Sequence, residues 1–146
     1  MTATIFVLNG PNLNLLGTRE PEIYGSQTLA DIETMLVEQA RAHDLALDFR
    51  QTNHEGVLVD WLHEAHRVGA RAVLLNAGAY THTSIGLLDA IRSIAVPVIE
   101  VHLSDPTTRE PFRHLSYVAM AAADTVQGLG ARSYVVALDK AMQLQG

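Results

Sequence analysis

The chain has 146 residues, a length typical of one domain, and 48% of them are apolar, which is enough for a single hydrophobic core. Its net charge of −6 argues against nucleic acid or an anionic membrane as a partner. The absence of cysteine excludes disulfides and thiolate metal sites, and no apolar stretch approaches the roughly 20 residues that span a bilayer. The first residues also lack the basic start of a signal peptide. We therefore expect one cytoplasmic domain over residues 1–146, with neither nucleic acid nor membrane as a partner.

The first predicted element is a buried strand over residues 5–8, and a long loop over residues 9–25 follows it. A loop of this length inside a compact domain is usually functional or disordered. This loop carries leucine and isoleucine anchors, three glycines and two prolines, which is not typical of a disordered linker. It also carries Arg19 and Tyr24, and a nearby cation lowers the pKa of a tyrosine from its usual value of about 10. We interpret the loop as a candidate lid that holds an activated base.

Helical patterns and apolar strands then alternate along the chain. Thr28 and Asp31 have the spacing of a capping box, which predicts that a helix begins near Thr28. The apolar patterns predict further strands at residues 45–49, 72–75, 96–101 and 125–127, and further helices after Gly56, after Ser84 and around residues 134–142.

This order of elements predicts an α/β fold with a five-stranded parallel sheet and helices on both faces. The strands that begin at residues 5, 72 and 96 are continuously apolar, so we expect them at the centre of the sheet. The strands near residues 45 and 125 are more polar, so we expect them at the edges. The pattern matches the flavodoxin-like strand order 2-1-3-4-5.

Polar side chains follow four of the predicted strands. In an open parallel sheet, ligands bind beyond the carboxyl ends of the strands, at the point where the strand order reverses. The polar residues at these ends are Asn9 and Asn12, then Asn53, His54 and Glu55, then Asn76 and residues 80–83, and finally His102, Ser104 and Asp105. Their convergence predicts one binding site at this edge of the sheet.

Two histidines in these loops are candidates for chemistry. His102 ends a buried strand two residues after Glu100, which suits a general acid oriented by a carboxylate. The alternative is a structural histidine at the end of the strand. His82 precedes a predicted helix, where anions are favoured, although N-capping by Thr83 or Ser84 also explains this segment.

Other polar patterns are less specific. Arg109 and Arg113 would share one face of a helix and could bind a carboxylate, with a solvated helix face as the alternative. His63 and His66 are one residue short of the zinc-protease spacing, so we interpret them as surface residues and expect no metal. Residues 128–133 begin like a dinucleotide-binding fingerprint, but they end in serine and follow the last strand, so we predict a tight turn there.

Several long motifs in the chain carry a family resemblance. They are residues 8–17, Arg19-Glu20-Pro21, Tyr24-Gly25, residues 53–56, residues 78–84, residues 100–104, Arg109-Glu110 and residues 112–114. Over roughly residues 5–140 the chain resembles the type II 3-dehydroquinate dehydratases. The resemblance implies a flavodoxin-like fold and a lyase that dehydrates 3-dehydroquinate to 3-dehydroshikimate by anti elimination through an enolate. It implies no cofactor and no metal, a homo-oligomer that is a dodecamer built from trimers, and a place in aromatic amino acid biosynthesis or quinate catabolism.

The resemblance also implies a role for each matching residue. Tyr24 removes the proton from carbon 2, and Arg19 activates it. Asn12 helps to stabilise the enolate through a water molecule. His102 protonates the leaving hydroxyl at carbon 1, with Glu100 as its orienting carboxylate. The implied substrate-binding residues are Asn76, His82, Leu103, Ser104 and Arg113, together with Asp89, which matches a position that contacts a neighbouring subunit's site.

The chain departs from the family pattern at three positions. Asp105 replaces a usual asparagine, and Asp124 and Ser133 stand where glycine is frequent. The first departure concerns substrate affinity, because Asp105 follows Ser104. We predict that its carboxylate points outward and pairs with Arg109.

Two other kinds of function remain as alternatives. One is a flavodoxin-like module that binds flavin or a nucleotide, which the incomplete glycine fingerprint and the lack of a phosphate-binding loop with lysine argue against. The other is an inactive structural homo-oligomer, which the presence of Arg19, Tyr24 and His102 argues against.

Overall fold

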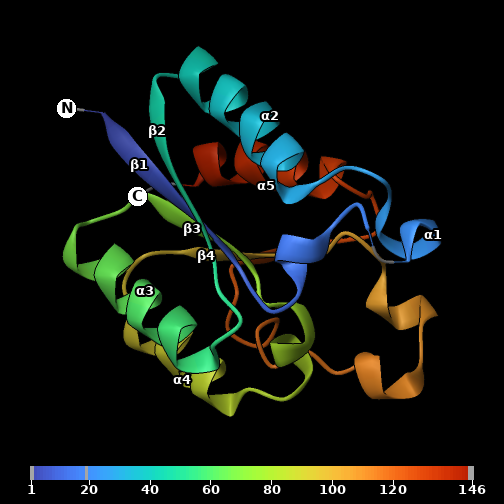
Figure 1. Cartoon of the computed structure of the whole chain (residues 1–146). Coiled ribbons are helices and arrows are strands. Elements are labelled where there is room, and N and C mark those ends of the chain that lie inside the picture. The colour runs from blue at the N-terminus through green and yellow to red at the C-terminus, as the bar shows by residue number, and fades with distance from the viewer. Residues whose placement is uncertain (1, 19, 145–146) are drawn as a thin grey trace.

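A five-stranded parallel sheet forms the centre of the molecule, with the strand order β2-β1-β3-β4-β5 (Figure 1). The computed structural model describes residues 2–18 and 20–144, without the side chain of residue 24. The strands are β1 (Ala3–Asn9), β2 (Leu45–Gln51), β3 (Ala72–Asn76), β4 (Val98–Val101) and β5 (Asp124–Val126). The predicted flavodoxin-like order is therefore confirmed, with the more polar strands β2 and β5 at the edges.

Helices cover both faces of this sheet, as the sequence predicts (Figure 1). The helices α2 (Leu29–Ala42) and α5 (Arg132–Gln143) pack side by side on one face, and α3 (Glu55–Arg67) and α4 (Ile85–Ser93) pack on the other. Short elements gather where the strands end. They are α1 (Pro21–Tyr24) and the 3₁₀ turns η1 (Leu13–Leu15), η2 (Gly78–His82), η3 (Pro106–Thr108) and η4 (Pro111–Arg113).

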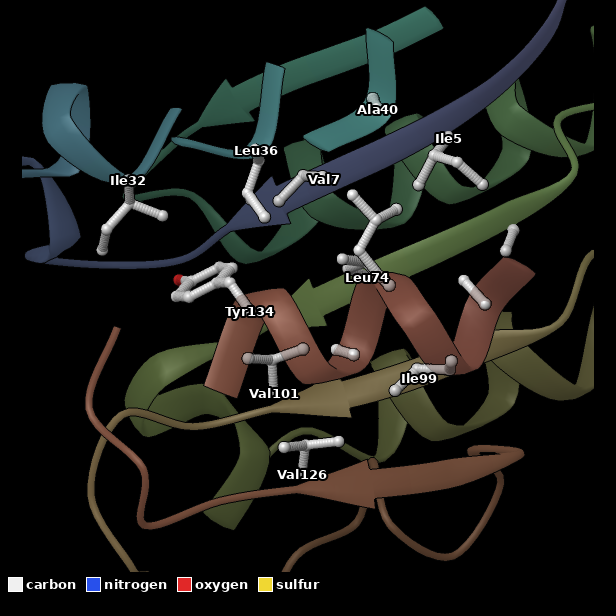
Figure 2. Close-up of a cluster of buried hydrophobic side chains, with 14 of the residues drawn as sticks. Ile5, Val7, Ile32, Leu36, Ala40, Leu74, Ile99, Val101, Val126 and Tyr134 are labelled. Atoms are coloured by element: carbon white, nitrogen blue, oxygen red, sulfur yellow. The ribbon is translucent and has the colours of Figure 1, made fainter. Parts of the chain in front are cut away.

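The central strands have apolar side chains on both faces, because each face is covered by helices. Ile5 and Val7 of β1 point into the core layer beneath α2 and α5, where Figure 2 shows them with Leu74 of β3. Phe6 and Leu8 point into the layer beneath α3 and α4. Successive side chains of a strand face opposite sides of a sheet, so a strand that is buried on both sides is a continuous apolar run.

Local signals set the predicted helix starts. Thr28 Oγ1 accepts a hydrogen bond from the backbone N–H of Asp31 (3.1 Å), and the Asp31 carboxylate accepts one from the N–H of Thr28 (3.0 Å). This capping box confirms the predicted start of α2. Ser84 caps α4 in a similar way, because its hydroxyl accepts a hydrogen bond from the N–H of Leu87 (2.9 Å).

The prediction that Arg109 and Arg113 lie on one helix is wrong. They belong to two successive 3₁₀ turns, because Pro111 begins the second turn. Proline lacks the N–H that a continuous helix needs, and it keeps the preceding residue out of the helical conformation. Glu110 accordingly has the extended backbone angles φ −59° and ψ 146°.

Within residues 2–18 and 20–144, no helix combines the length and the apolar character that spanning a bilayer requires.

Candidate active site

A cavity of about 170 Å³ lies at the carboxyl ends of β1, β3 and β4. Its walls come from the loops after these strands and from the two turns η3 and η4. The polar side chains that line it are those of Asn12, Asn76, His82, His102, Ser104, Arg109 and Arg113. Loops that are far apart in the sequence thus meet at the edge of the sheet where the sequence predicts a site.

The carboxylate of Glu100, on β4, accepts four hydrogen bonds from the described residues at this edge. Glu100 is 1% exposed, and its carboxylate accepts these hydrogen bonds from Thr81 Oγ1 (2.9 Å), Thr125 Oγ1 (2.7 Å), Ser116 Oγ and a ring nitrogen of His102. Burial alone would raise the pKa of Glu100, but the hydrogen bond and charge of His102, together with the Ser116 and Thr125 hydroxyls, lower it to about 2. Glu100 is therefore a buried carboxylate that stays ionised.

His102 is held by this carboxylate in one orientation. Its Nε2 lies 2.7 Å from Glu100 Oε2, and an ionised carboxylate can only accept, so Nε2 carries a proton. The other ring nitrogen, Nδ1, is left for exchanging a proton with a ligand. The backbone N–H of His102 already pairs with the carbonyl of Val126 (2.9 Å), so the side chain is not needed to end the strand. This geometry favours the general-acid role over the structural alternative.

His82 presents its ring to the same cavity from η2. Its Nδ1 lies 2.8 Å from the carbonyl oxygen of Leu115, so Nδ1 donates and Nε2 of the neutral ring is an acceptor. Burial lowers the pKa of His82, and the nearby charges of His102 and Arg113 lower it further. Because Ser84 supplies the cap of α4, His82 is available to accept a hydrogen bond from a ligand hydroxyl.

Two arginines bring positive charge to the cavity from separate turns. Arg109 Nη1 donates to Ser104 Oγ (3.4 Å). Arg113 forms an ion pair with Glu110, and its guanidinium lies 5.1 Å from the centre of the Phe112 ring. Because the chain has a net charge of −6, an anionic ligand requires cations placed at its binding site, and these two arginines are such cations.

A second cavity of about 560 Å³ adjoins the first and shares Leu103, Ser104 and Arg109 with it. Its other walls come from Glu22, Ile23 and Gly25 of the candidate lid, from Gln27, Asp105 and Thr108, and from the turn that contains Gly128, Gly130 and Ala131. The candidate lid therefore borders the space beside the smaller cavity.

Two of the predicted catalytic residues cannot be placed. Arg19 lies outside the described residues, and only the backbone of Tyr24 is described, as the last residue of α1. Their roles therefore remain predictions.

Asp89 is exposed on α4 and is not among the described residues that line either cavity. The structure therefore does not bring it to the site of its own chain.

Asp105 is held by its neighbours rather than by Arg109. Its carboxylate accepts hydrogen bonds from the N–H (3.0 Å) and the hydroxyl (2.6 Å) of Thr107, and these hydrogen bonds lower the pKa of Asp105. It caps η3 and faces the larger cavity. The predicted outward direction and the predicted pairing with Arg109 are therefore wrong, because Thr107 holds the carboxylate and Asp105 lines a cavity.

The sequence analysis missed several side chains that support the site. Ser116 and Thr125 bind Glu100, and Tyr134 links Asn9 to Asn76 through its hydroxyl. These residues belong to elements that are distant in sequence from their partners. In the structure, β5 pairs with β4 in a register that places Thr125 directly opposite Glu100.

The other patterns have structural explanations. His66 Nδ1 accepts the backbone N–H of Ala95 (3.2 Å), and in the part of the chain that the structure describes no three His, Asp or Glu side chains lie close enough to hold a metal. Gly128 and Gly130 adopt positive φ angles in a turn before α5, which Ser133 supports by accepting the N–H of Leu129 (3.1 Å). The predicted tight turn is confirmed.

The sheet order and the buried carboxylate–histidine pair at its carboxyl edge define a flavodoxin-like α/β enzyme. Residues 3–142 match the model of the family described as dehydroquinase class II. The 3-dehydroquinate dehydratase of Acidovorax ebreus (strain TPSY) is 57% identical over 143 residues, covering 95% of this chain and 97% of that protein. That of Hyphomonas neptunium is 58% identical over 146 residues, covering 100% of this chain and 97% of that protein. The chain belongs to the class II dehydroquinase family.

Solved structures agree with this assignment. The crystal structure of a type II dehydroquinase from Butyrivibrio crossotus has a TM-score of 0.94 to this chain at 37% sequence identity, and the match covers 97% of this chain and 98% of that one. A type II dehydroquinase from Propionibacterium acnes has a TM-score of 0.92 at 40% identity, with the same coverage.

Proposed function

We propose that the smaller cavity is the active site in which this chain acts on 3-dehydroquinate. The family to which the chain belongs defines the activity. The chain is a 3-dehydroquinate dehydratase, a hydro-lyase that converts 3-dehydroquinate to 3-dehydroshikimate. The reaction removes a proton from carbon 2 and a hydroxyl group from carbon 1, so it needs a base, an acid and a group that stabilises the enolate between the two steps. The single observation that carries the proposal is the Glu100–His102 pair beside the cavity.

His102 is the proposed general acid. Its Nδ1 gives a proton to the departing hydroxyl, while its Nε2 stays bonded to Glu100. The low pKa of Glu100 keeps that carboxylate ionised at neutral pH, so its negative charge stabilises the protonated ring before the transfer.

Tyr24 is the proposed base, with Arg19 as the cation that activates it. Keeping a tyrosine ionised at neutral pH requires its pKa to fall by about 3 units, or about 4 kcal/mol. A neighbouring guanidinium contributes more of this when the lid closes and water leaves, because the interaction is stronger in a low dielectric. The position of α1 beside the larger cavity supports this role for the lid.

Asn12 is the proposed partner of the enolate, through a water molecule. It lines the cavity in a left-handed conformation, with φ 69°. Its backbone N–H donates to Asn53 Oδ1 (3.0 Å), which ties the first loop to the loop after β2. This bond fixes the backbone that carries the Asn12 side chain, so its amide needs little rearrangement as negative charge develops on the substrate.

The remaining proposed contacts hold the substrate. Arg113 and the Leu103–Ser104 segment suit its carboxylate, and His82 and Asn76 suit its hydroxyl groups, since all of them line the cavity. The expected ligand is thus a small anion with several hydroxyl groups.

We further propose that each chain is one catalytic domain of a cytoplasmic dodecamer built from trimers. Large apolar side chains that are exposed on the single chain support burial between subunits, among them Phe112 (68%) and Ile85 (56%). Asp89 lies on α4, the helix that begins with Ile85, and its proposed role is at the site of a neighbouring subunit.

The direct test is an absorbance assay for the conjugated enone product, with 3-dehydroquinate as the substrate. We expect enone to accumulate with wild-type protein and much more slowly with His102→Ala. Wild-type turnover in that variant would overturn the catalytic role of His102, and no product with wild-type protein would overturn the activity.

A further inference from the structure

Three buried side chains form a hydrogen-bonded row behind the wall of the cavity. Asn9 and Asn76 end the neighbouring strands β1 and β3 and lie opposite each other in register. Tyr134 of α5 lies between them, and Figure 2 shows its hydroxyl oxygen on the side toward which the strands run. Asn9 and Tyr134 are 0% exposed and Asn76 is 3% exposed.

The backbone fixes the orientation of both amides. Asn9 Nδ2 lies 2.9 Å from the carbonyl oxygen of Arg50, which can only accept, so Asn9 Oδ1 faces Tyr134. Asn76 Oδ1 lies 3.2 Å from the backbone N–H of Gly78, which can only donate, so Asn76 Nδ2 faces Tyr134. An amide oxygen accepts and an amide nitrogen donates.

These constraints set the direction of the two hydrogen bonds at Tyr134. The hydroxyl donates its proton to Asn9 Oδ1 (2.6 Å) and accepts a hydrogen bond from Asn76 Nδ2 (2.9 Å). Asn76 then has its oxygen engaged by Gly78 and one N–H engaged by Tyr134. Among the described contacts, its second N–H is the group that remains for a ligand in the cavity.

We propose that Tyr134 is a positioning residue that commits Asn76 to donate a hydrogen bond to the substrate. This inference rests on the proposed substrate-binding role of Asn76. Because the free N–H of Asn76 can only donate, it binds an acceptor on the ligand, such as a hydroxyl or carboxylate oxygen. Without the tyrosine hydroxyl, a buried amide N–H loses its partner, so the amide can rotate away from its binding orientation.

The test uses Tyr134→Phe, which removes the hydroxyl and keeps the ring in the core. We expect the KM for 3-dehydroquinate to rise about tenfold, while kcat stays within about twofold, because the amide acts in binding. The matched control is Leu138→Val, one helical turn along α5 and fully buried in the same core layer. It removes core volume without touching the row, so its KM should equal that of the wild type even where its Tm falls.

A double-mutant cycle with Asn76→Ala separates positioning from general loosening of the core. Asn76→Ala should raise KM, and adding Tyr134→Phe should raise it no further, because the hydroxyl acts through this amide. Additive effects, or an equal rise in KM with Leu138→Val, would overturn the inference. If Tyr134→Phe does not fold, Tyr134→Met removes the hydroxyl with a flexible side chain that can fill the core, and a wild-type KM in that variant would overturn the inference too.

The failure of the two proposals can be distinguished. A wild-type KM in Asn76→Ala would contradict both the proposed binding role of Asn76 and this inference. A raised KM in Asn76→Ala together with a wild-type KM in Tyr134→Phe would end only the inference.

Discussion

Glu100 shows how much of the site depends on a single buried residue. Its carboxylate connects β4 to β5 through Thr125, to η2 through Thr81 and to the segment after η4 through Ser116. A buried charge is tolerated when hydrogen bonds replace its lost hydration. The same carboxylate thus joins the loops that form the cavity and orients His102.

Acid should therefore destabilise the protein through Glu100. Its pKa is lowered to about 2 in the folded protein from an ordinary value near 4.5, so the unfolded chain takes up the proton first as pH falls. The stabilisation is complete above about pH 4.5 and is lost between there and about pH 2. We expect urea unfolding at a series of pH values to show this loss in the wild type and a shallower dependence in Glu100→Gln. An equal dependence in both proteins would contradict the assignment.

The two steps of the reaction should respond differently to loss of His102. His102→Ala should slow product formation more than exchange of the carbon 2 proton with solvent deuterium, because the histidine acts on the leaving hydroxyl. The two rates are measured on the same samples by nuclear magnetic resonance and by enone absorbance. Equal losses would indicate a shared or purely structural role.

At the scale of elements, prediction succeeded where the signal is local or repetitive. The continuous apolar runs of β1 and β3 identified the centre of the sheet, and the cap residues Thr28 and Ser84 identified the starts of helices. Between β4 and β5 the chain forms short turns that begin at prolines. There the spacing of Arg109 and Arg113 suggested a helix, although both still reach one cavity.

The roles of Thr125 and Tyr134 could not be predicted, because their contacts span long stretches of chain. Thr125 is 25 residues from Glu100, and Tyr134 is 125 residues from Asn9. Periodicity shows that a residue lies on a buried face, but it does not identify the buried polar group that the residue meets.

The cap of η3 gives a test at this scale. In Asp105→Asn the side-chain oxygen can still accept from Thr107, so we expect the KM to stay within about threefold of the wild type. Asp105→Ala removes the cap and should lower the free energy of unfolding. Steady-state kinetics and urea unfolding measure both quantities. A large fall in KM for Asp105→Asn would instead show that the carboxylate repels the substrate.

At the scale of the whole molecule, the exposed α4 face and the proposed subunit contact make one prediction. Light scattering should give a mass that matches a dodecamer. Asp89→Ala should raise the KM of the assembled protein, although Asp89 does not line the cavity of its own chain. A monomeric mass, or an unchanged KM in a fully assembled variant, would remove the role of Asp89 at a neighbouring site.

The position of α5 has a consequence for how the protein is made. Tyr134, Ala137, Leu138 and Ala141 are fully buried against the sheet, so one face of β3, β4 and β5 stays exposed until the ribosome has released this helix. The row that orients Asn76 joins residue 9 to residue 134, and it too forms only then. We expect nascent chains that end before α5 to bind chaperones and to lack activity, even though they already contain every proposed catalytic residue.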